Sequence, residues 1–276
     1  MQNPDDILTV LVLFQSKLHE APAFKSLSVA RQGIGTRGQL FVYDNSPKRQ
    51  EIASSEMWNI HYVHDPTNPG VSKAYNEANT YALELGMSWM LLADQDTNFP
   101  PHIYHQFRHA LLDNPQCTIF APTLIDDKGI VSPFVQQFHR GRRLKNVRAG
   151  KMRLHDTFVV NSGLIISVSS FRAAGGYDER LRLDFSDVNF FQKQKALASH
   201  FIVLDAVCRH SLSSSADTQL KDALNRFAIY LEGSRITGRA FGNAILLECY
   251  AILRAIRLSW QHRSLRFLST LFSRAI

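Results

Sequence analysis

The chain has 276 residues, of which 45% are apolar and 20% are charged, and its formal net charge is +7. This composition is that of a globular protein with a substantial core, so it excludes a disordered or low-complexity chain. The positive charge favours anionic partners, such as phosphorylated substrates, nucleic acid or anionic lipid. Three widely spaced cysteines argue against a disulfide framework and indicate a reducing compartment.

The first half of the sequence alternates apolar runs with segments of helical character. The runs predict strands at residues 7–14, 40–43, 60–63, 89–93 and 119–121, and the other segments predict helices at about 22–31, 71–85 and 100–112. This alternation indicates an α/β fold with a mostly parallel central sheet. The run at 7–14 has no Lys or Arg before it and is shorter than the ~20 residues that cross a bilayer. We therefore expect neither a secretory signal nor a membrane-spanning helix.

The second half has a less regular pattern. Residues 124–156 show no clear element, regular structure resumes at 157–167, and a helix is expected from about Ser186. A strand at 201–204 and a linker at 205–209 lead to His210. Beyond about Gly242 the pattern is that of amphipathic helices. We predict a catalytic domain at 1–234 and a basic helical extension at 235–276.

Carboxylates follow directly after two of the predicted strands. Asp44 comes after the strand at 40–43, and Asp94 and Asp96 come after the strand at 89–93. Ligands of parallel α/β sheets bind at the carboxyl ends of strands, so these acids should share one edge. Asp94 and Asp96 could hold Mg²⁺ or Mn²⁺, because such hard cations prefer oxygen ligands and bridge diphosphates. An acidic surface turn is the alternative interpretation.

Glycines mark two further positions. Gly70 precedes the predicted helix at 71–85, where it would let the backbone approach a ligand while the helix offers unpaired N–H groups to an anion. A simple turn before a helix is the alternative. Gly33, Gly35 and Gly38 have the spacing of a dinucleotide-binding loop, but they follow a helix and lead into a strand. Because this context is reversed, we predict no dinucleotide site.

Five segments occur in the order of one known family. They are residues 42–46 (Val-Tyr-Asp-Asn-Ser), 68–78 (Asn-Pro-Gly-Val-Ser-Lys-Ala-Tyr-Asn-Glu-Ala), 91–96 (Leu-Leu-Ala-Asp-Gln-Asp), 161–167 (Asn-Ser-Gly-Leu-Ile-Ile-Ser) and 176–179 (Gly-Tyr-Asp-Glu). With these segments, the chain resembles the inverting glycosyltransferases of family 2, which have the GT-A fold. The segment at 91–96 is similar to the form typical of bacterial rhamnosyltransferases. The resemblance covers roughly residues 7–210.

The resemblance implies a set of site residues. Asp44 would contact the nucleotide base, and Asp94, Asp96 and His210 would hold the metal, although a lone histidine is more often structural. The nucleotide-sugar would be bound by Phe14, Gln15, Asp44, Asn45, Gly70, Lys73, Asn76, Asp94, Gln95 and Asn161.

The resemblance also places the general base in the segment at 184–190. Asp187 would remove the acceptor's proton, with Asp184 as its rival, although Ser186 and Asn189 stand where the family often has acids. One of Asp184 and Ser186 is also expected to cap the helix that follows.

The implied function is inverting sugar transfer in bacterial cell-surface polysaccharide synthesis. The DQD form at 94–96 indicates dTDP-L-rhamnose as donor, with UDP-sugars next, and the acceptor would be a glycan or a lipid-diphosphate-linked molecule. We expect a cytoplasmic location, including the inner face of the cell membrane.

Two basic segments have two interpretations each. Residues 140–153 contain seven Arg and Lys and no acid, which fits a solvated loop or contact with phosphates of the acceptor or the nucleotide. Residues 235–276 contain seven Arg and one acid, Glu248, which fits amphipathic helices on anionic lipid, giving peripheral membrane association. Packing against the catalytic domain or a partner subunit is the alternative.

Other functions make different demands on the sequence. A nucleotidyltransferase would show a Gly-rich basic loop after the first strand, which Gln15, Ser16 and Lys17 do not supply. A nucleic-acid-binding module would spread basic residues through an aromatic groove rather than place acids at strand ends, so we expect no nucleic-acid partner. A degenerate, non-catalytic nucleotide-sugar-binding protein stays open because of Ser186 and Asn189.

Overall fold

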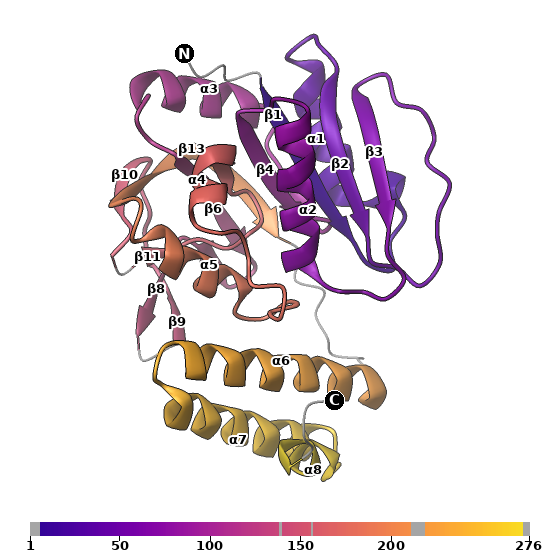
Figure 1. Cartoon of the computed structure of the whole chain (residues 1–276), viewed down its shortest axis with the longest axis vertical. Coiled ribbons are helices and arrows are strands. Elements are labelled where there is room, and N and C mark those ends of the chain that lie inside the picture. Colours follow the sequence, from indigo (N-terminus) through magenta and orange to yellow (C-terminus); the bar gives the residue numbers. More distant parts are fainter. Residues whose placement is uncertain (1–5, 138–139, 156, 211–218, 273–276) are drawn as a thin grey trace.

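The computed structural model describes residues 6–137, 140–155, 157–210 and 219–272, which form an α/β part followed by three helices (Figure 1). The strands are β1 (Ile7–Leu13), β2 (Gly38–Asp44), β3 (Trp58–His64), β4 (Trp89–Asp94), β5 (Thr97–Asn98), β6 (Ile119–Asp126), β7 (Gly129–Ser132), β8 (Phe134–Gln137), β9 (Arg140–Arg143), β10 (Gly150–Arg153), β11 (Thr157–Phe158), β12 (Ile165–Ser167) and β13 (His200–His210). The helices are η1 (Leu18–Glu20), α1 (Pro22–Gln32), α2 (Val71–Glu84), α3 (Ile103–Asp113), α4 (Val168–Ala173), α5 (Ser186–Gln194), α6 (Leu220–Ala240), α7 (Ala244–Gln261) and α8 (Arg266–Phe272).

The main sheet has the strand order β10-β13-β6-β12-β4-β1-β2-β3. Strands β4, β1, β2 and β3 run parallel, and β13 runs parallel to β6, while β12 is antiparallel between β4 and β6. The predicted α/β fold with a mostly parallel sheet is therefore confirmed. In the register, Leu13 stands opposite Asp44 and Val12 opposite Asp94, so both acids reach the same edge of the sheet, as expected.

Helices cover both faces of the sheet, because its central strands are apolar on both sides. Leu27 of α1 and Phe107 of α3 pack on one face, while Tyr75 of α2 and Phe190 of α5 pack on the other. A fully buried side chain of this size stabilises the fold by about 1.5–3 kcal/mol. The result is a three-layer arrangement that leaves the carboxyl ends of the strands for a site.

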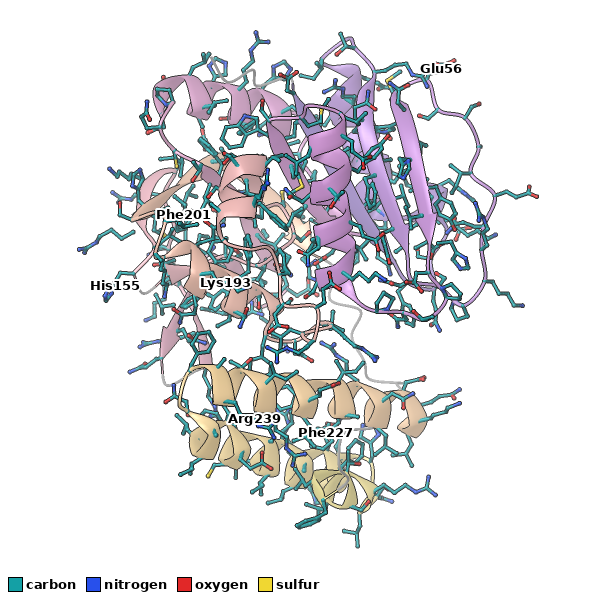
Figure 2. All side chains as sticks on the ribbon, viewed as in Figure 1. Glu56, His155, Lys193, Phe201, Phe227 and Arg239 are labelled. Atoms are coloured by element: carbon teal, nitrogen blue, oxygen red, sulfur yellow. The ribbon has the colours of Figure 1, made fainter. Side chains whose placement is uncertain are left out.

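Helices α6, α7 and α8 have a small core of their own, in which Phe227 is buried (Figure 2). The predicted boundary at residue 235 falls inside α6, so the helical segment begins earlier, at Leu220. Gly233 of α6 packs against the backbone at Asp184, where a Cβ would lie 3.1 Å from the carbonyl oxygen. The extension thus contacts the segment that precedes α5. No described helix is long and apolar enough to cross a membrane.

Three local expectations were wrong. The basic stretch is not an irregular loop, because it contains β9, which pairs with β8, and β10, which pairs with β13. Residues 205–209 are not a linker but part of β13, which continues past a register shift between Val203 and Val207. Neither Asp184 nor Ser186 caps α5, because Phe185 holds that position with φ 68° and without a side-chain bond to the helix.

Gly70 is required by a backbone contact with Arg182, and its contact with a nucleotide-sugar stays a prediction. Its φ is 97°, and a Cβ added there would lie 2.1 Å from the carbonyl oxygen of Arg182. That oxygen accepts a 2.9 Å hydrogen bond from the N–H of Val71, the first residue of α2. The prediction of a free anion site at this helix start is therefore wrong for Val71, and Gly70 serves to bring α2 against the segment before α5.

We expect Gly70→Ala to destabilise the fold by about 3 kcal/mol or more, because the new methyl group meets a backbone atom and also has an unfavourable φ. Gly86→Ala is the matched control, since Gly86 has φ 67° and no atom within 4 Å of an added Cβ, so only the backbone cost of about 1 kcal/mol applies. Urea unfolding of both variants measures the difference. Equal losses would contradict the proposed contact.

Candidate active site

The segment Asp94-Gln95-Asp96, which we call the acidic triplet, begins at the last residue of β4. The backbone N–H of Asp94 donates to Ser162 Oγ at 3.0 Å, and Tyr75 donates its hydroxyl proton to Asp94 Oδ1 at 3.2 Å. These contacts come from the β11–β12 connection and from α2, so two neighbouring elements fix the carboxylate at the sheet edge. Sequence reasoning missed both partners, although each lies inside a recognised motif.

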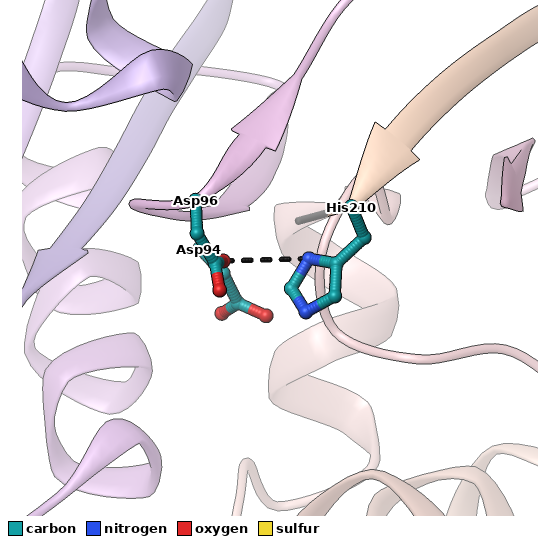
Figure 3. A group of neighbouring side chains, drawn as sticks. All are labelled: Asp94, Asp96 and His210. Atoms are coloured by element: carbon teal, nitrogen blue, oxygen red, sulfur yellow. Dashed lines mark ion pairs between the residues drawn. The ribbon is translucent and has the colours of Figure 1, made fainter. Parts of the chain in front are cut away.

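His210 joins the triplet from the end of β13. Backbone pairing sets His210 opposite Thr97 of β5, and Thr97 Oγ1 lies 2.9 Å from His210 Nδ1. The same nitrogen lies 3.3 Å from Asp96 Oδ1 (Figure 3). The strand pairing therefore brings the imidazole beside the two acids, which is where the family resemblance placed His210.

The three side chains fit a divalent cation. Potential ligand atoms of Asp94, Asp96 and His210 all lie within 4.8 Å of one another. Burial raises the pKa of Asp94 to about 6, and the charge of Asp96 adds to the rise while His210 opposes it. Two carboxylates that repel each other in a partly buried site are stabilised by a shared cation, and carboxylate oxygens suit Mn²⁺ or Mg²⁺.

Asp187 lies in the first turn of α5 and is electrostatically coupled to the acidic triplet. Its pKa is raised to about 6, because burial and the charges of Asp184 and Asp94 together outweigh the opposing 2.8 Å hydrogen bond from the N–H of Val188. Burial raises the pKa of Tyr75, whose hydroxyl contacts Asp94, and the charges of Asp94 and Asp187 add to the rise. Asp187 therefore lies within electrostatic reach of Asp94 and Tyr75.

Asp184 is engaged elsewhere. Its Oδ1 accepts a 3.0 Å hydrogen bond from Arg226 of α6, and its Oδ2 is buried without a hydrogen-bond partner among the described residues. This ion pair connects the segment before α5 to the C-terminal helices. Arg226 lies 42 residues from Asp184 in the sequence, so no local pattern could have indicated it.

Asp44 reaches the predicted edge but is fully buried. Its oxygens accept hydrogen bonds from the backbone N–H of Ser46 at 2.9 Å, and from Gln50 and Tyr62 at 2.7 Å each. Burial alone would raise the pKa of Asp44, but these hydrogen bonds outweigh it and the pKa is lowered. The carboxylate therefore organises the loop after β2, while the neighbouring Asn45 has a buried Oδ1 without a partner among the described residues.

Gln95 is bonded to the backbone after β1. Its Oε1 accepts the N–H of Phe14 at 2.8 Å, and its Nε2 donates to the carbonyl oxygen of Phe14 at 3.2 Å. The next residue, Gln15, has φ 52° and donates its N–H to Ser46 Oγ at 2.8 Å. The loop after β1 is therefore tied to β4 and to the loop after β2, and the Phe14 side chain is left 43% exposed.

Asn76 and Lys73, which are predicted to bind the nucleotide-sugar, have partners within the protein. The amide of Asn76 donates to the carbonyl oxygen of Tyr177 and to Glu179, at 3.0 Å each, so it ties α2 to the loop before α5. Lys73 lies between two carboxylates, 3.8 Å from Asp65 and 3.7 Å from Glu77.

Asn161 lies nearer to α5 and links two elements of the site. Its Oδ1 accepts the hydroxyl proton of Tyr177 at 2.7 Å, and its Nδ2 donates to Ser186 Oγ at 3.3 Å. A contact of Asn161 with the donor stays a prediction, as it does for Lys73 and Asn76.

Comparisons with known proteins bear on this arrangement. The model of glycosyl transferase family 2 matches residues 27–174, which is more than half of the chain. The chain belongs to glycosyl transferase family 2. The predicted family is confirmed, and the predicted enzyme class agrees with it.

This family 2 chain is similar to several proteins at modest identity. It is 29% identical over 136 residues to the dTDP-rhamnosyl transferase RfbF of Shigella flexneri, a match covering 48% of the chain and 45% of that relative. Solved structures of TarS from S. aureus share its fold at 12–13% identity. One TarS structure has a TM-score of 0.55, covering 88% of this chain and 43% of that chain. TarS 1–349 with UDP-GlcNAc has a TM-score of 0.56, covering 85% of this chain and 67% of that one.

We expect Mn²⁺ or Mg²⁺ to raise the thermal midpoint of the wild type and not that of Asp94→Asn or Asp96→Asn. At a hundredfold excess over Kd the gain is about 2.7 kcal/mol, which corresponds to roughly 5 °C for a chain of this size. Differential scanning fluorimetry measures the shift. Asp127→Asn, at an exposed acid outside the site, is the matched control, and an equal shift in all four proteins would contradict the metal site.

Proposed function

We propose that this chain catalyses an inverting transfer of a sugar from a nucleotide-sugar to an acceptor hydroxyl. The observation that carries the proposal is the grouping of Asp94, Asp96 and His210 at the carboxyl edge of the sheet, with Asp187 within electrostatic reach of Asp94. Such a reaction needs a group that accepts a proton on one side of the anomeric carbon and a way to stabilise the departing diphosphate on the other. These residues can meet both needs.

The base in this proposal is Asp187. A carboxylate with a pKa near 6 is ionised at neutral pH and yet more basic than an ordinary aspartate, which suits proton removal. Asp184 is the weaker candidate because its accessible oxygen is paired with Arg226. As Asp187 takes the proton from the acceptor hydroxyl, that oxygen attacks the anomeric carbon and the nucleoside diphosphate leaves from the opposite face.

Asp94, Asp96 and His210 would hold Mg²⁺ or Mn²⁺, which supplies positive charge to the leaving diphosphate when bound. Tyr75 and Ser162 position Asp94, and Thr97 positions His210. These contacts keep the ligand atoms together before any substrate arrives, so little reorganisation is needed during the reaction.

The donor in this proposal is dTDP-L-rhamnose. The likeness to RfbF, together with the residue triplet at 94–96, supports this choice. A UDP-sugar is the second donor to test. The acceptor would be a glycan or a lipid-diphosphate-linked molecule, as part of bacterial cell-surface polysaccharide synthesis.

Asp187→Asn should lower kcat by about 10²–10⁴ because it removes the base, while the donor Kd changes little. Asp184→Asn should cost less than about tenfold, since the amide can still bond to Arg226. The rate of hydrolysis of dTDP-L-rhamnose, and then of UDP-GlcNAc, measures kcat in each protein, with water as acceptor and Mn²⁺ present.

In the wild type, kcat should fall as the pH drops through about 6. Asp187, whose pKa is raised to about 6, is then protonated and can no longer accept the proton of the acceptor.

A larger loss in Asp184→Asn than in Asp187→Asn would reverse the assignment of the base. Donor binding without turnover in the wild type would favour the degenerate, non-catalytic protein instead. Neither binding nor turnover of any nucleotide-sugar would overturn the proposed function.

We also propose that helix α7 associates with the membrane surface. Its outer face is apolar and exposed along a continuous line of residues that we call the α7 stripe: Ile245, Ile252, Leu253, Ile256 and Trp260. Trp260 is 86% exposed, and arginines at positions 257, 263 and 266 lie nearby. Apolar residues beside cationic ones suit an anionic lipid surface, at which aromatic side chains enter the interface.

The double variant Ile256→Ser, Trp260→Ser should bind vesicles of phosphatidylglycerol and phosphatidylcholine about tenfold more weakly or worse, because it removes two large apolar contacts. Sedimentation with vesicles measures the loss. Leu112→Ser is the control, as Leu112 is 65% exposed but lies on α3. A truncation at Arg235 would divide α6 and expose the small core that α6 forms with α7 and α8, so point variants are the better test. Unchanged binding in the double variant would remove the membrane proposal.

A further inference from the structure

A pocket lies between β9, the residue before α5, α6 and α7. Its volume is about 500 Å³. Arg140, Arg254 and Arg257 line it together with the rings of Phe185, Tyr230 and Tyr250, and no carboxylate is among its lining residues. None of the residues predicted to bind the donor or the metal takes part. This arginine pocket is therefore separate from the site of the triplet.

Two of the three arginines of the pocket lie over aromatic rings. The Arg140 guanidinium lies 4.0 Å from the centre of the Tyr250 ring, and that of Arg254 lies 4.0 Å from the centre of the Tyr230 ring. The Nε of Arg254 is buried and has no hydrogen-bond partner among the described residues. Three cations in one pocket, with no carboxylate partner among the residues that the structure describes, favour a bound anion, and guanidinium groups match the oxygens of a phosphate.

Nearby acids do not neutralise the pocket. Asp184 is paired with Arg226, and Glu248 is paired with Arg235 at 2.9 Å. Both acids therefore already have a cation of their own. The positive charge of the arginine pocket remains available to a ligand.

The pocket adjoins the proposed base on one side and the α7 stripe on the other. Phe185 lines the pocket, contacts Tyr230 with ring centres 5.4 Å apart, and precedes Asp187 by two residues. Leu253 belongs both to the pocket lining and to the α7 stripe. A ligand held here would thus place its anionic group between a reacting hydroxyl near Asp187 and an apolar surface.

We propose that the arginine pocket binds the phosphate or diphosphate of a lipid-linked acceptor, whose apolar chain follows the α7 stripe. This inference rests on the proposed glycosyl transfer and names the class of its acceptor. The three arginines bind the phosphate oxygens, and Leu253 and its neighbours contact the start of the chain. The acceptor's sugar then extends past Phe185 toward Asp187.

Binding of farnesyl diphosphate to the full chain tests the proposal, with EDTA present so that no metal holds the diphosphate at the triplet. Arg140→Gln and Arg257→Gln should each raise the Kd about tenfold, since each removes one charge-assisted contact. Arg239→Gln is the matched control, because Arg239 is exposed on α6 outside the pocket, and its Kd should stay within about twofold of the wild type. Isothermal titration calorimetry measures all four proteins.

Farnesol and inorganic pyrophosphate separate the two parts of the ligand. We expect both to bind at least tenfold more weakly than farnesyl diphosphate. Farnesol binding as tightly would overturn the role of the arginines, and pyrophosphate binding as tightly would overturn the lipid part of the proposal. An unchanged Kd for farnesyl diphosphate in both pocket variants would overturn the site as a whole.

Donor turnover in the same variants separates this inference from the proposed function. Hydrolysis of dTDP-L-rhamnose with Mn²⁺ should be unchanged in Arg140→Gln and Arg257→Gln, because the pocket does not contact the donor. Normal hydrolysis with arginine-independent binding of farnesyl diphosphate would defeat the pocket and leave the proposed function intact. Arginine-dependent binding without any donor turnover would support the pocket's anion site and count against the enzyme.

Discussion

The carbonyl oxygen of Arg182 accepts the first N–H of α2, and this contact determines where the segment 181–187 lies. Ser72 donates its hydroxyl proton to the carbonyl oxygen of Leu181, which fixes the same segment a second time. Gly70 permits both bonds, because any side chain there would separate the two backbones. Asp187 is the last residue of this held segment, so its position depends on the start of α2.

Helix α6 holds the other side of the segment. Arg226 pairs with Asp184, Tyr230 packs on Phe185, and Gly233 lets the two backbones approach closely. The C-terminal helices therefore do more than extend the chain, because they help to fix the residue proposed as the base. A change in how α6 packs would move Asp187 relative to the triplet even if no residue of the site were altered.

The sequence predicted the sheet and the triplet because their signals are local. The runs that became β1 and β4 are continuous and apolar, and Asp94 follows the second of them directly. The strand β9 was not predicted, because all four of its residues, from Arg140 to Arg143, are exposed arginines or glycine. They therefore show no alternation of apolar and polar side chains. The pairing of Asp184 with Arg226 and the arginine pocket combine residues far apart in the chain, which no local pattern reports.

The paired bonds between Gln95 and the backbone of Phe14 have a consequence for how the triplet is interpreted. A glutamine amide offers one acceptor and one donor, so it imitates a peptide group and prolongs the ladder between β1 and β4 by one rung. Glutamate could accept but not donate at that point, and aspartate or asparagine would be one methylene too short to match it. Besides its place in the family resemblance, Gln95 thus has a role in the backbone architecture that joins β1 to β4.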